Sequence, residues 1–234
     1  MNSRLVYTAA FSVCLLALVT AKPASSPSSH QVDFLRRIMP LQTHIGQIGG
    51  LDTDSTGNLV VFHRSDRKWS FDSFFFDRFN TLKYGPIEKD VLALIDPATM
   101  QVVDSWGANR FYMPHGLTVD SDSNVWLTDV GLHQVFKFDL NSSPDEPLLV
   151  LGERLEKGVD EAHFCKPTGV AVSALNGDVF VADGYCNERV VQFDAKGRFV
   201  KEFMDRDVAM QVVHSVVLLE SEGLVCAASR EDGR

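Results

Sequence analysis

The amino-acid sequence predicts an all-β protein and, more specifically, a β-propeller. From about Leu41 onward, apolar runs of four to seven residues alternate with turn clusters of Asp, Asn, Ser and Gly. The runs are rich in β-branched and aromatic residues and are too short for globular helices, so they are typical of strands. The strands also recur as a unit along the chain. No segment with helical periodicity interrupts them.

The recurring unit consists of a strand, an Asp/Asn/Gly turn, a second strand, a loop and a third strand. Its copies are marked by Gly50, Gly116, Gly169 and Ser215, which stand at equivalent positions 66, 53 and 46 residues apart. Such intervals are close to one propeller blade plus insertions. Because a single blade cannot bury both faces of its sheet, we expect about four blades to stack around a common axis.

The N-terminal segment predicts a secretory signal peptide. A weakly basic start precedes an apolar run over residues 9–19, and the small residue Ala21 suits signal peptidase, so residues 1–21 are expected to be removed. The apolar run is shorter than the roughly 20 residues that span a bilayer, although an uncleaved signal anchor is the alternative. Pro and Ser dominate residues 22–43, which predict a flexible leader before a propeller domain over 44–234.

The acidic charge balance argues against two classes of partner, and the predicted secretion allows the cysteines to form disulfides. A formal net charge of −9 argues against a nucleic-acid partner, and no Lys/Arg-rich run suggests a membrane surface. In an oxidising compartment, Cys165 and Cys186 flank a strand-rich stretch and can pair, which leaves Cys226 over. Asn141 begins an Asn-Ser-Ser sequence, which is either a glycosylation acceptor or a chance match.

Two of the seven histidines, His115 and His214, occupy the same position in their repeats, directly before the marker residue. In a propeller this position faces the central channel. Several imidazoles gathered there would form a His-only zinc site with an open coordination position. The alternative is that each is a hydrogen-bonded structural histidine at the start of a strand.

Two further side chains suit chemistry at such a site. Arg64 follows a strand of the first repeat, and its guanidinium fork matches a carboxylate; the alternative is an exposed charge beside Asp66. Tyr185 lies between Gly184 and Cys186. Near a metal or a cation its phenol can ionise and act as a base, and the alternative is a packing aromatic on a blade loop.

The repeats resemble NHL-type blades, and the sequence resembles the peptidyl-α-hydroxyglycine α-amidating lyase (peptidylamidoglycolate lyase) family. The similarity covers roughly residues 44–234, and several motifs occur in the same order. These motifs are VFHRSD (61–66), YGPIEKD (84–90), MPHGL (113–117), TDVGLHQVFK (128–137), HFCKPT (163–168) and ADGYCNER (182–189).

The resemblance implies a six-bladed, zinc-dependent enzyme that cleaves peptidyl-α-hydroxyglycine into a peptide amide and glyoxylate during peptide amidation. In the family three histidines hold zinc, and His115 and His214 match the first two. A structural calcium ion is implied as well, held in part by backbone carbonyls that match those of Leu51 and Leu117. A separate peptidylglycine hydroxylating monooxygenase is an implied partner, because it would supply the substrate peptide.

The resemblance also implies roles for the remaining site residues. Tyr185 matches the catalytic base, and Arg64 and Arg230 match two active-site arginines. A Cys165–Cys186 disulfide would hold the tyrosine in place.

One departure from the family pattern is expected to matter. The sequence ends at Arg234, about two blades before six would close, so we expect a C-terminally truncated propeller that lacks the third zinc histidine and the calcium-binding aspartate. Three interpretations stay open. The chain is a form of the active lyase, a non-catalytic secreted binding module or inactive partial lyase, or a fragment that does not fold stably.

Overall fold

The computed structural model describes residues 5–6, 45–142, 146–204 and 210–233. The predicted leader and, apart from Leu5–Val6, the predicted signal peptide lie outside these residues. Within them the chain is almost entirely β-structure, and its helical element is one short turn, Glu220–Glu222. None of the helical structure described is long and apolar enough to cross a bilayer.

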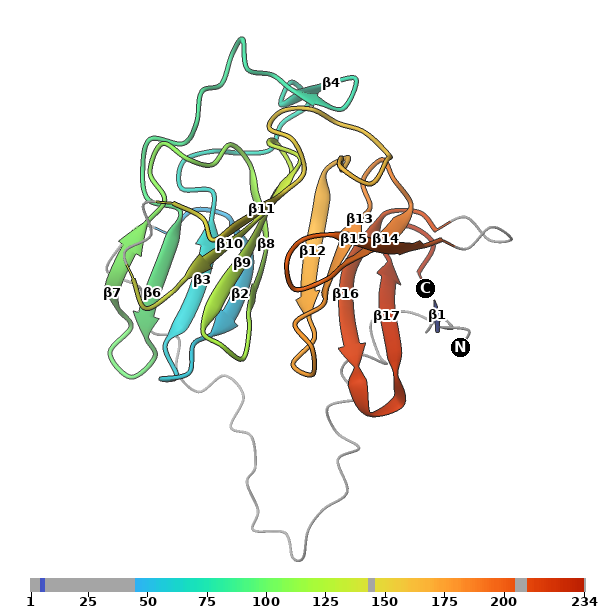
Figure 1. Cartoon of the computed structure of the whole chain (residues 1–234). Helices are drawn as coiled ribbons and strands as arrows, with labels where there is room; N and C mark the ends of the chain where they lie inside the picture. Colours follow the sequence, from blue (N-terminus) through green and yellow to red (C-terminus); the bar gives the residue numbers. More distant parts are fainter. Residues whose placement is uncertain (1–4, 7–44, 143–145, 205–209, 234) are drawn as a thin grey trace, which may run out of the picture.

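The strands form four sheets that stand side by side as blades (Figure 1). Blade 1 contains β2 (Ile48–Thr53), β3 (Leu59–His63), β6 (Leu92–Asp96) and β7 (Gln101–Trp106). Blade 2 contains β8 (Pro114–Val119), β9 (Asn124–Asp129), β10 (Gln134–Asp139) and β11 (Leu149–Leu151). Blade 3 contains β12 (Pro167–Val172), β13 (Val179–Asp183), β14 (Arg189–Phe193) and β15 (Phe199–Phe203).

A fourth sheet has three strands and includes one strand from the N-terminal region. Its core is the antiparallel pair β16 (Val213–Leu219) and β17 (Leu224–Ser229), and β1 (Leu5–Val6) pairs with β17 in parallel. A short hairpin of β4 (Phe74–Phe75) and β5 (Arg78–Phe79) is inserted between β3 and β6. The expectation of about four blades is therefore met by three four-stranded blades and the inner hairpin of a fourth.

The structure corrects the predicted repeat in one respect. Each of the first three blades has a fourth, outer strand that the three-strand repeat did not include: β7, β11 and β15. The outer strand Gln101–Trp106 is largely exposed and mixes polar with apolar residues, which leaves a weak sequence signal. The outer strands Leu149–Leu151 and Phe199–Phe203 are less exposed and contain apolar residues, so the three-strand repeat left out two apolar runs that the sequence contains.

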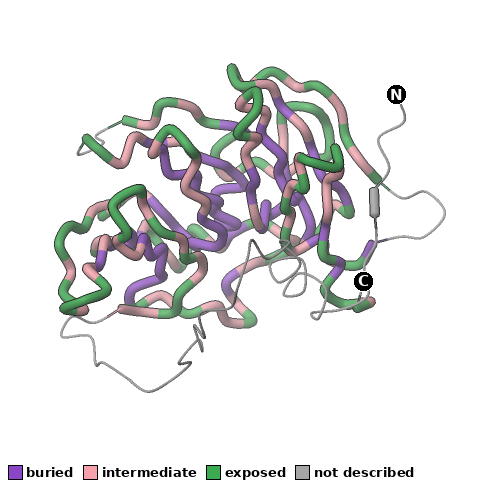
Figure 2. The backbone as a smooth tube through the Cα atoms, turned by 90° about the horizontal axis from the view of Figure 1, so that it is seen from below, coloured by how far each residue is buried: buried purple, intermediate pink, exposed green. Residues whose placement is uncertain are grey.

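The hydrophobic core lies between the blades. Successive residues of a strand point to opposite faces of its sheet, so each middle strand contributes to two layers. In β9, Val125 and Leu127 pack toward blade 1, whereas Trp126 packs toward blade 3. In β13, Val181 faces blade 2 and Phe180 faces the fourth sheet. Figure 2 shows the resulting buried stretches running through the interior, with exposed turns around them.

The repeated glycines have a steric reason. The inner strands β2, β8, β12 and β16 contact one another in that order around the axis. A Cβ atom at Gly50 would lie 2.5 Å from the backbone nitrogen of Leu117, and one at Gly116 would lie 2.6 Å from the carbonyl oxygen of Thr168. Real Cβ atoms do not approach backbone so closely. At Gly50 and Gly116 the inner strands of neighbouring blades therefore converge and leave no room for a Cβ atom, whereas a Cβ atom at Gly169 would lie 3.5 Å from the nearest atom, an ordinary contact.

Replacing Gly116 with alanine is expected to lower the free energy of unfolding by about 1–3 kcal/mol, the usual cost of overpacking. The added methyl group must push β8 away from β12. Gly85 is the matched control, because a Cβ there meets no atom within 4 Å. Urea denaturation should find Gly85→Ala within about 0.5 kcal/mol of the wild type. Equal stability of the two variants would contradict the close approach of the blades.

Candidate active site

Each inner strand carries an irregularity at its start, where the predicted zinc histidines stand. The pairing with the second strand shifts register in all four sheets: between Ile48 and Gly50, Pro114 and Leu117, Pro167 and Gly169, and Val213 and Ser215. Such bulges change the direction of a side chain and are common beside active sites. The residues within the four irregularities include Gly49, His115, Thr168 and His214.

The two histidines come together at the axis. Their ring centroids lie 4.9 Å apart, although 99 positions separate them in the sequence. The Nδ1 atom of His115 lies 2.7 Å from the carbonyl oxygen of Thr168. Because a carbonyl only accepts, Nδ1 must carry the proton and donate it, which leaves the Nε2 lone pair of His115 directed into the site. A backbone carbonyl on the other ring nitrogen is the usual way to orient a metal-binding histidine.

Burial favours neutral imidazoles at this site. Desolvation, followed by the proximity of His214, lowers the pKa of His115 to about 3, and the Thr168 carbonyl only partly opposes this shift. Burial and then Arg230 lower the pKa of His214. Metal ligation requires an unprotonated imidazole nitrogen, so the protonation state fits a cation such as zinc.

Tyr185 bridges the two histidines. Its hydroxyl lies 3.0 Å from Nε2 of His115 and 3.4 Å from Nε2 of His214. The tyrosine follows β13 in a loop that passes against the start of β16, where a Cβ on Gly184 would lie 1.8 Å from the carbonyl oxygen of Val213. Glycine before the tyrosine is therefore a steric requirement. The Cys165–Cys186 disulfide is present and ties this loop to the segment that leads into β12.

The two predicted arginines occupy equivalent places in different blades. Arg64 directly follows β3 and Arg230 directly follows β17, so each extends from the second strand of its sheet. Arg230 donates to the Tyr185 hydroxyl at 3.4 Å through Nη1, and its guanidinium carbon lies 5.3 Å from that ring centroid. Burial opposes the charge on Arg230, but a hydrogen bond to Glu231 and the proximity of Tyr185 outweigh it and raise its pKa.

Arg64 is buried rather than exposed, so the alternative of a solvent-exposed charge beside Asp66 is wrong. Its Nε donates to the carbonyl of Pro114 at 2.8 Å, and Nη1 donates to Oε1 of Gln47 at 2.6 Å. Burial lowers the pKa of Arg64, and the charge interactions with Tyr185 and Asp129 oppose this shift. A buried guanidinium fixed beside the next blade's histidine strand is well placed to bind an anionic group.

An aromatic side chain that the sequence did not indicate completes one wall of the site. The Trp69 ring centroid lies 5.1 Å from that of Tyr185 and 6.5 Å from that of His115. The guanidinium of Arg64 lies over the indole at 5.5 Å. Lys166 is also close, with Nζ 5.7 Å from the Tyr185 centroid. These contacts join loops of different blades, so no local pattern could have revealed them.

Two buried aspartates also escaped the sequence analysis, although a signal for them existed. Asp129 and Asp183 end the second strands of blades 2 and 3, after Leu-Thr and Val-Ala respectively. Asp129 accepts backbone hydrogen bonds from Tyr112 and Met113. Asp183 accepts from the Cys165 nitrogen. Each carboxylate thus holds the loop that leads into its inner strand, and their equivalent places in the repeat could have identified them.

The predicted calcium and glycosylation residues are also placed by the structure. Leu51 lies in β2 and Leu117 in the adjacent inner strand β8, whose backbones approach closely at Gly50. Asn141 is exposed in the turn after β10, and Ser143 of its acceptor sequence lies outside the described residues. Calcium binding and glycosylation both stay predictions.

The metal-ligand set is incomplete among the described residues. One group there brings three or more His, Cys, Asp or Glu side chains within ligand distance, and it consists of Asp77 and the two disulfide cysteines. Cystine sulfurs are not thiolate ligands, so this group is not a zinc site. Within the part of the chain described, His115 and His214 therefore have no third such ligand.

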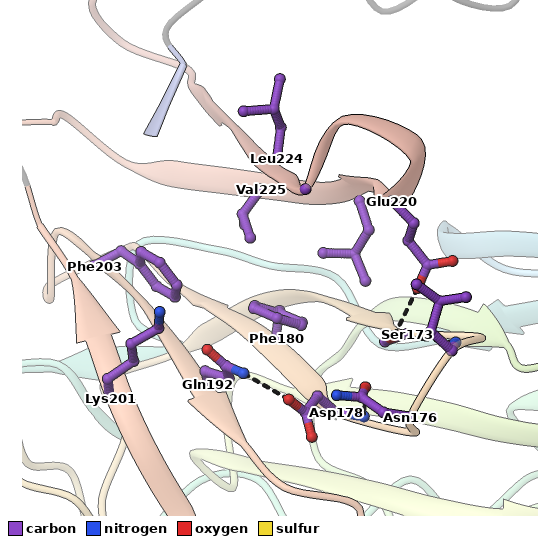
Figure 3. Close-up of a pocket in the computed structure, with 13 residues that line it drawn as sticks. Ser173, Asn176, Asp178, Phe180, Gln192, Lys201, Phe203, Glu220, Leu224 and Val225 are labelled. Carbon is purple, nitrogen blue, oxygen red and sulfur yellow. Dashed lines mark hydrogen bonds between the residues drawn. The ribbon is translucent and has the colours of Figure 1, made fainter. Parts of the chain in front are cut away.

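One cavity lies apart from the predicted site residues. A groove of about 250 Å³ runs between blade 3 and the β16–β17 pair (Figure 3). It is lined by Phe180, Lys201 and Phe203 on one side and by Leu218 and Glu220 on the other. Ser173 at the rim of the groove directly follows β12, at the opposite end of that strand from Thr168. The usual rise per residue separates the two by about 16 Å. None of the predicted site residues lines this groove.

A buried histidine outside the site predicts a specific pH dependence of stability. His133 is fully buried, its Nδ1 accepts from the Lys166 backbone N–H at 3.0 Å, and its Nε2 has no hydrogen-bond partner among the described residues. Burial, followed by the nearby Lys166, lowers its pKa to about 4 from the ordinary 6.5. Between pH 4 and pH 6.5 the unfolded chain binds more protons at this histidine than the folded chain does. The stability that neutral His133 allows is therefore fully present above pH 6.5 and is lost as the pH falls to 4.

The loss from His133 is expected to be about 3 kcal/mol between pH 7 and pH 4. His133→Asn removes the titration, keeps an acceptor for the Lys166 N–H and tolerates the φ of 60° at this position. Urea unfolding at pH 7 and pH 4 measures the free energy of unfolding. Its decrease between the two pH values should be about 3 kcal/mol smaller in His133→Asn than in the wild type. His163→Gln is the contrasting control: Asp160 raises the pKa of His163, so this variant loses stabilisation at low pH and should show no reduction of the pH-dependent loss. An unchanged pH dependence in His133→Asn would refute the assignment.

The repeat, the fold and the axial cluster define the class of protein. The NHL repeat family model matches residues 111–138 and 164–193, which lie in blades 2 and 3. Among solved structures, a streptogramin B lyase matches with a TM-score of 0.52 at 13% identity, covering 81% of this chain and 50% of that one. The virginiamycin B lyase of Staphylococcus aureus gives the same score over 84% and 56%. At such identity these structures show the fold alone, so the chain has a β-propeller fold, with NHL repeats matched over residues 111–138 and 164–193.

Sequence comparison with curated proteins identifies relatives within this class. The chain is a homologue of peptidyl-alpha-hydroxyglycine alpha-amidating lyases, with 41% identity to lyase 2 of Drosophila melanogaster over 83% of this chain and 48% of the relative. A probable lyase of Caenorhabditis elegans is 44% identical over 81% and 55%. The peptidylglycine alpha-amidating monooxygenase of Rattus norvegicus is 47% identical over 81% of this chain. The chain spans about half the length of these lyases and 20% of the rat protein.

Proposed function

We propose that this protein is a peptidyl-α-hydroxyglycine α-amidating lyase, which releases glyoxylate and a peptide amide. One observation carries the proposal: a tyrosine hydroxyl lies within 3.4 Å of two neutral histidines and an arginine at the propeller axis. These groups come from three different sheets, and a second, buried arginine lies beside them. The homology to named lyases supports the same chemistry.

The substrate is an N-acyl hemiaminal that carries a hydroxyl, a carboxylate and an amide nitrogen on one carbon. In its phenolate form, Tyr185 accepts the hydroxyl proton, and the electron pair left on oxygen forms the new carbonyl as the carbon–nitrogen bond breaks. The protonated Tyr185 then gives this proton to the departing amide nitrogen, so the tyrosine returns to its phenolate form and atoms and charge balance. Arg64 and Arg230 bind the carboxylate that becomes part of glyoxylate, and fix the substrate for the transfer.

The proposal includes zinc as the resident metal. The residues present fit it in part: His115 and His214 are neutral, close together and correctly oriented, and a catalytic site keeps an open position. Bound zinc would supply Lewis acidity that makes a hydroxyl easier to deprotonate. Calcium held partly by the carbonyls of Leu51 and Leu117 would be structural, joining β2 to β8. The disulfide is consistent with the further proposal that the chain is secreted.

A second candidate function rests on the ligand set. Because the proposed zinc site has only two histidines among the described residues, an alternative is that the 234-residue chain serves as a secreted binding module that retains the blades without turnover. Retention of stoichiometric zinc distinguishes the two functions, since a module without a working centre has no reason to hold the metal.

The decisive experiment measures glyoxylate release from a short α-hydroxyglycine-extended peptide by residues 22–234 with added zinc. Elemental analysis of the same sample gives the zinc content. The lyase proposal predicts glyoxylate release and bound zinc, both lost in His115→Ala. His163→Ala is the matched control, because His163 lies on an exposed loop away from the axis. A cooperatively folded chain that releases no glyoxylate and holds no zinc would support the binding module instead.

A further inference from the structure

Arg64 is a buried cation that no carboxylate pairs with among the described residues. It is 6% exposed, and its hydrogen bonds go to the carbonyl oxygen of Pro114 and to Oε1 of Gln47. Its third nitrogen, Nη2, has no hydrogen-bond partner in the described part of the chain. Arg189, which is 1% exposed, differs because Asp183 pairs with it at 3.0 Å. A buried charge is costly unless it is paired, so Arg64 is suited to an anionic ligand.

The indole of Trp69 covers this guanidinium. The guanidinium carbon of Arg64 lies 5.5 Å from the ring centroid of Trp69, and tryptophan is the aromatic side chain that attracts a cation most strongly. Hydrogen bonds to Pro114 and Gln47 already restrain two nitrogens of the group. The indole contact adds a third restraint on the position of the guanidinium.

Trp69 is itself held by its surroundings. Its ring lies 5.0 Å from that of Phe74, and both rings pack against the core between blades 1 and 2. The chain turns directly after it, because the N–H of Ser70 donates to the Ser73 hydroxyl at 2.9 Å and the N–H of Ser73 donates to the Ser70 carbonyl at 3.0 Å. Ser73 is fully buried, so the turn is part of the packed fold. The indole therefore has a fixed place in the wall of the site.

The same indole contacts the proposed base. The ring centroids of Trp69 and Tyr185 lie 5.1 Å apart, with an angle of 53° between the ring planes. Trp69 thus contacts two groups with different proposed roles: Arg64 binds the carboxylate, and Tyr185 takes the hydroxyl proton. In the proposed substrate both groups are on one carbon atom, so Arg64 and Tyr185 must keep a fixed separation. A displacement of about 1 Å can lower a rate about 100-fold.

We infer that Trp69 is a positioning residue, which holds the Arg64 guanidinium at the distance from Tyr185 that a carboxylate and a hydroxyl on one carbon require. The inference rests on the proposed function and specifies the substrate feature that Trp69 helps to recognise, the free terminal carboxylate. The alternative is that Trp69 only fills space in the wall. Its loss would then weaken all ligands equally, whereas a residue that acts through Arg64 affects ligands with a carboxylate selectively.

The test compares two peptides that differ only in the terminal charge. One is a hexapeptide that ends in glycine with a free carboxylate, and the other ends in glycinamide. Neither carries the hydroxyl group, so neither reacts. Isothermal titration calorimetry with the full-length chain and added zinc gives Kd for each peptide, and the ratio of the two Kd values measures recognition of the carboxylate. The wild type is expected to bind the carboxylate peptide about tenfold more tightly.

Trp69→Leu is expected to reduce this ratio about fivefold, equivalent to about 1 kcal/mol, because the cation–π contact is lost. Trp69→Phe keeps an aromatic face and should restore most of the ratio. Trp69→Met is the second test variant, since its flexible side chain fills space without a π-face and guards against a folding defect. Trp106→Leu is the matched control: Trp106 is a partly buried tryptophan of the same blade that contacts Phe138 instead, at 5.0 Å.

Arg64→Ala shows whether Trp69 acts through the arginine. It should lower the ratio at least as much as Trp69→Leu does, and adding Trp69→Leu to it should cause no further change. Equal ratios in Trp69→Leu and the wild type would overturn the inference, and so would a wild type without a preference for the carboxylate. A double variant with a lower ratio than Arg64→Ala would show that Trp69 acts independently of Arg64, which also contradicts it.

The two proposals fail in different ways. A carboxylate preference that depends on Trp69, in a chain that releases no glyoxylate from any substrate, would refute the lyase activity and leave the positioning of Arg64 by Trp69 established. Glyoxylate release by the wild type, together with an unchanged ratio in Trp69→Leu, would refute the role of Trp69 and leave the lyase activity intact.

Discussion

Tyr185→Phe is expected to lower the rate of glyoxylate release by about 10²- to 10⁴-fold, the usual contribution of a general base. The substitution removes one oxygen atom, and that atom is the group placed between His115 and His214. The ring remains, so its packing against Trp69 and the fold should persist. Steady-state kinetics should show the loss in kcat, because proton transfer occurs after the substrate has bound.

Tyr84→Phe is the matched control for this experiment. Its hydroxyl bonds to Asp72 at 3.1 Å, away from the histidines, so removal of the oxygen should leave the rate nearly unchanged. Both variants should retain the zinc content and the unfolding midpoint of the wild type. A Tyr185→Phe variant that keeps its rate within a small factor would show that another group accepts the proton.

Replacing both Cys165 and Cys186 with serine is expected to reduce the free energy of unfolding by about 3 kcal/mol. The disulfide closes a loop with a sequence separation of 21 residues, and its loss gives the unfolded chain more conformational freedom. The loop contains all of β12 and β13 and ends beside Tyr185. Activity should therefore fall as well, because the position of the tyrosine becomes less restricted.

Urea denaturation measures the stability change, and a reducing agent provides the control. Dithiothreitol should destabilise the wild type by a similar amount and leave the double-serine variant unaffected. The Cys226→Ser variant should remain as sensitive to reduction as the wild type, because Cys226 is not part of this disulfide. Equal midpoints for the wild type and the double-serine variant would show that blade packing alone maintains this region.

The strands and the blade repeat could be predicted because their signals are local. Apolar runs such as the one ending at Phe62, and markers such as Gly116, report a strand or a turn within a few residues of themselves. The outer strand Gln101–Trp106 was missed because exposure leaves it without an apolar run. The outer strand Leu149–Leu151 was left out of the predicted repeat although its apolar residues indicate a strand. The equivalence of His115 and His214 was also visible, since a repeat places equivalent residues at equivalent points around an axis.

The environment of the site residues was not predictable in the same way. The sequence leaves the burial of Arg64 undecided, because its partners Gln47 and Pro114 come from neighbouring strands. Trp69 carries no motif, yet it contacts both Tyr185 and Arg64. Long-range contacts of this kind depend on how the blades pack and on the loops that cross between them.

For this protein, the sequence by itself determined the β-strands, their repetition as blades, and which residues lead the inner strands toward the axis. Only the tertiary structure decided that the Tyr185 hydroxyl lies between His115 and His214, that Trp69 forms a wall beside it, and that Arg64 is buried. The physical reason is the distance along the sequence over which each signal acts. Periodicity and turn chemistry act over a few residues, whereas an active site at a propeller axis is assembled from strands about 50 residues apart in the sequence.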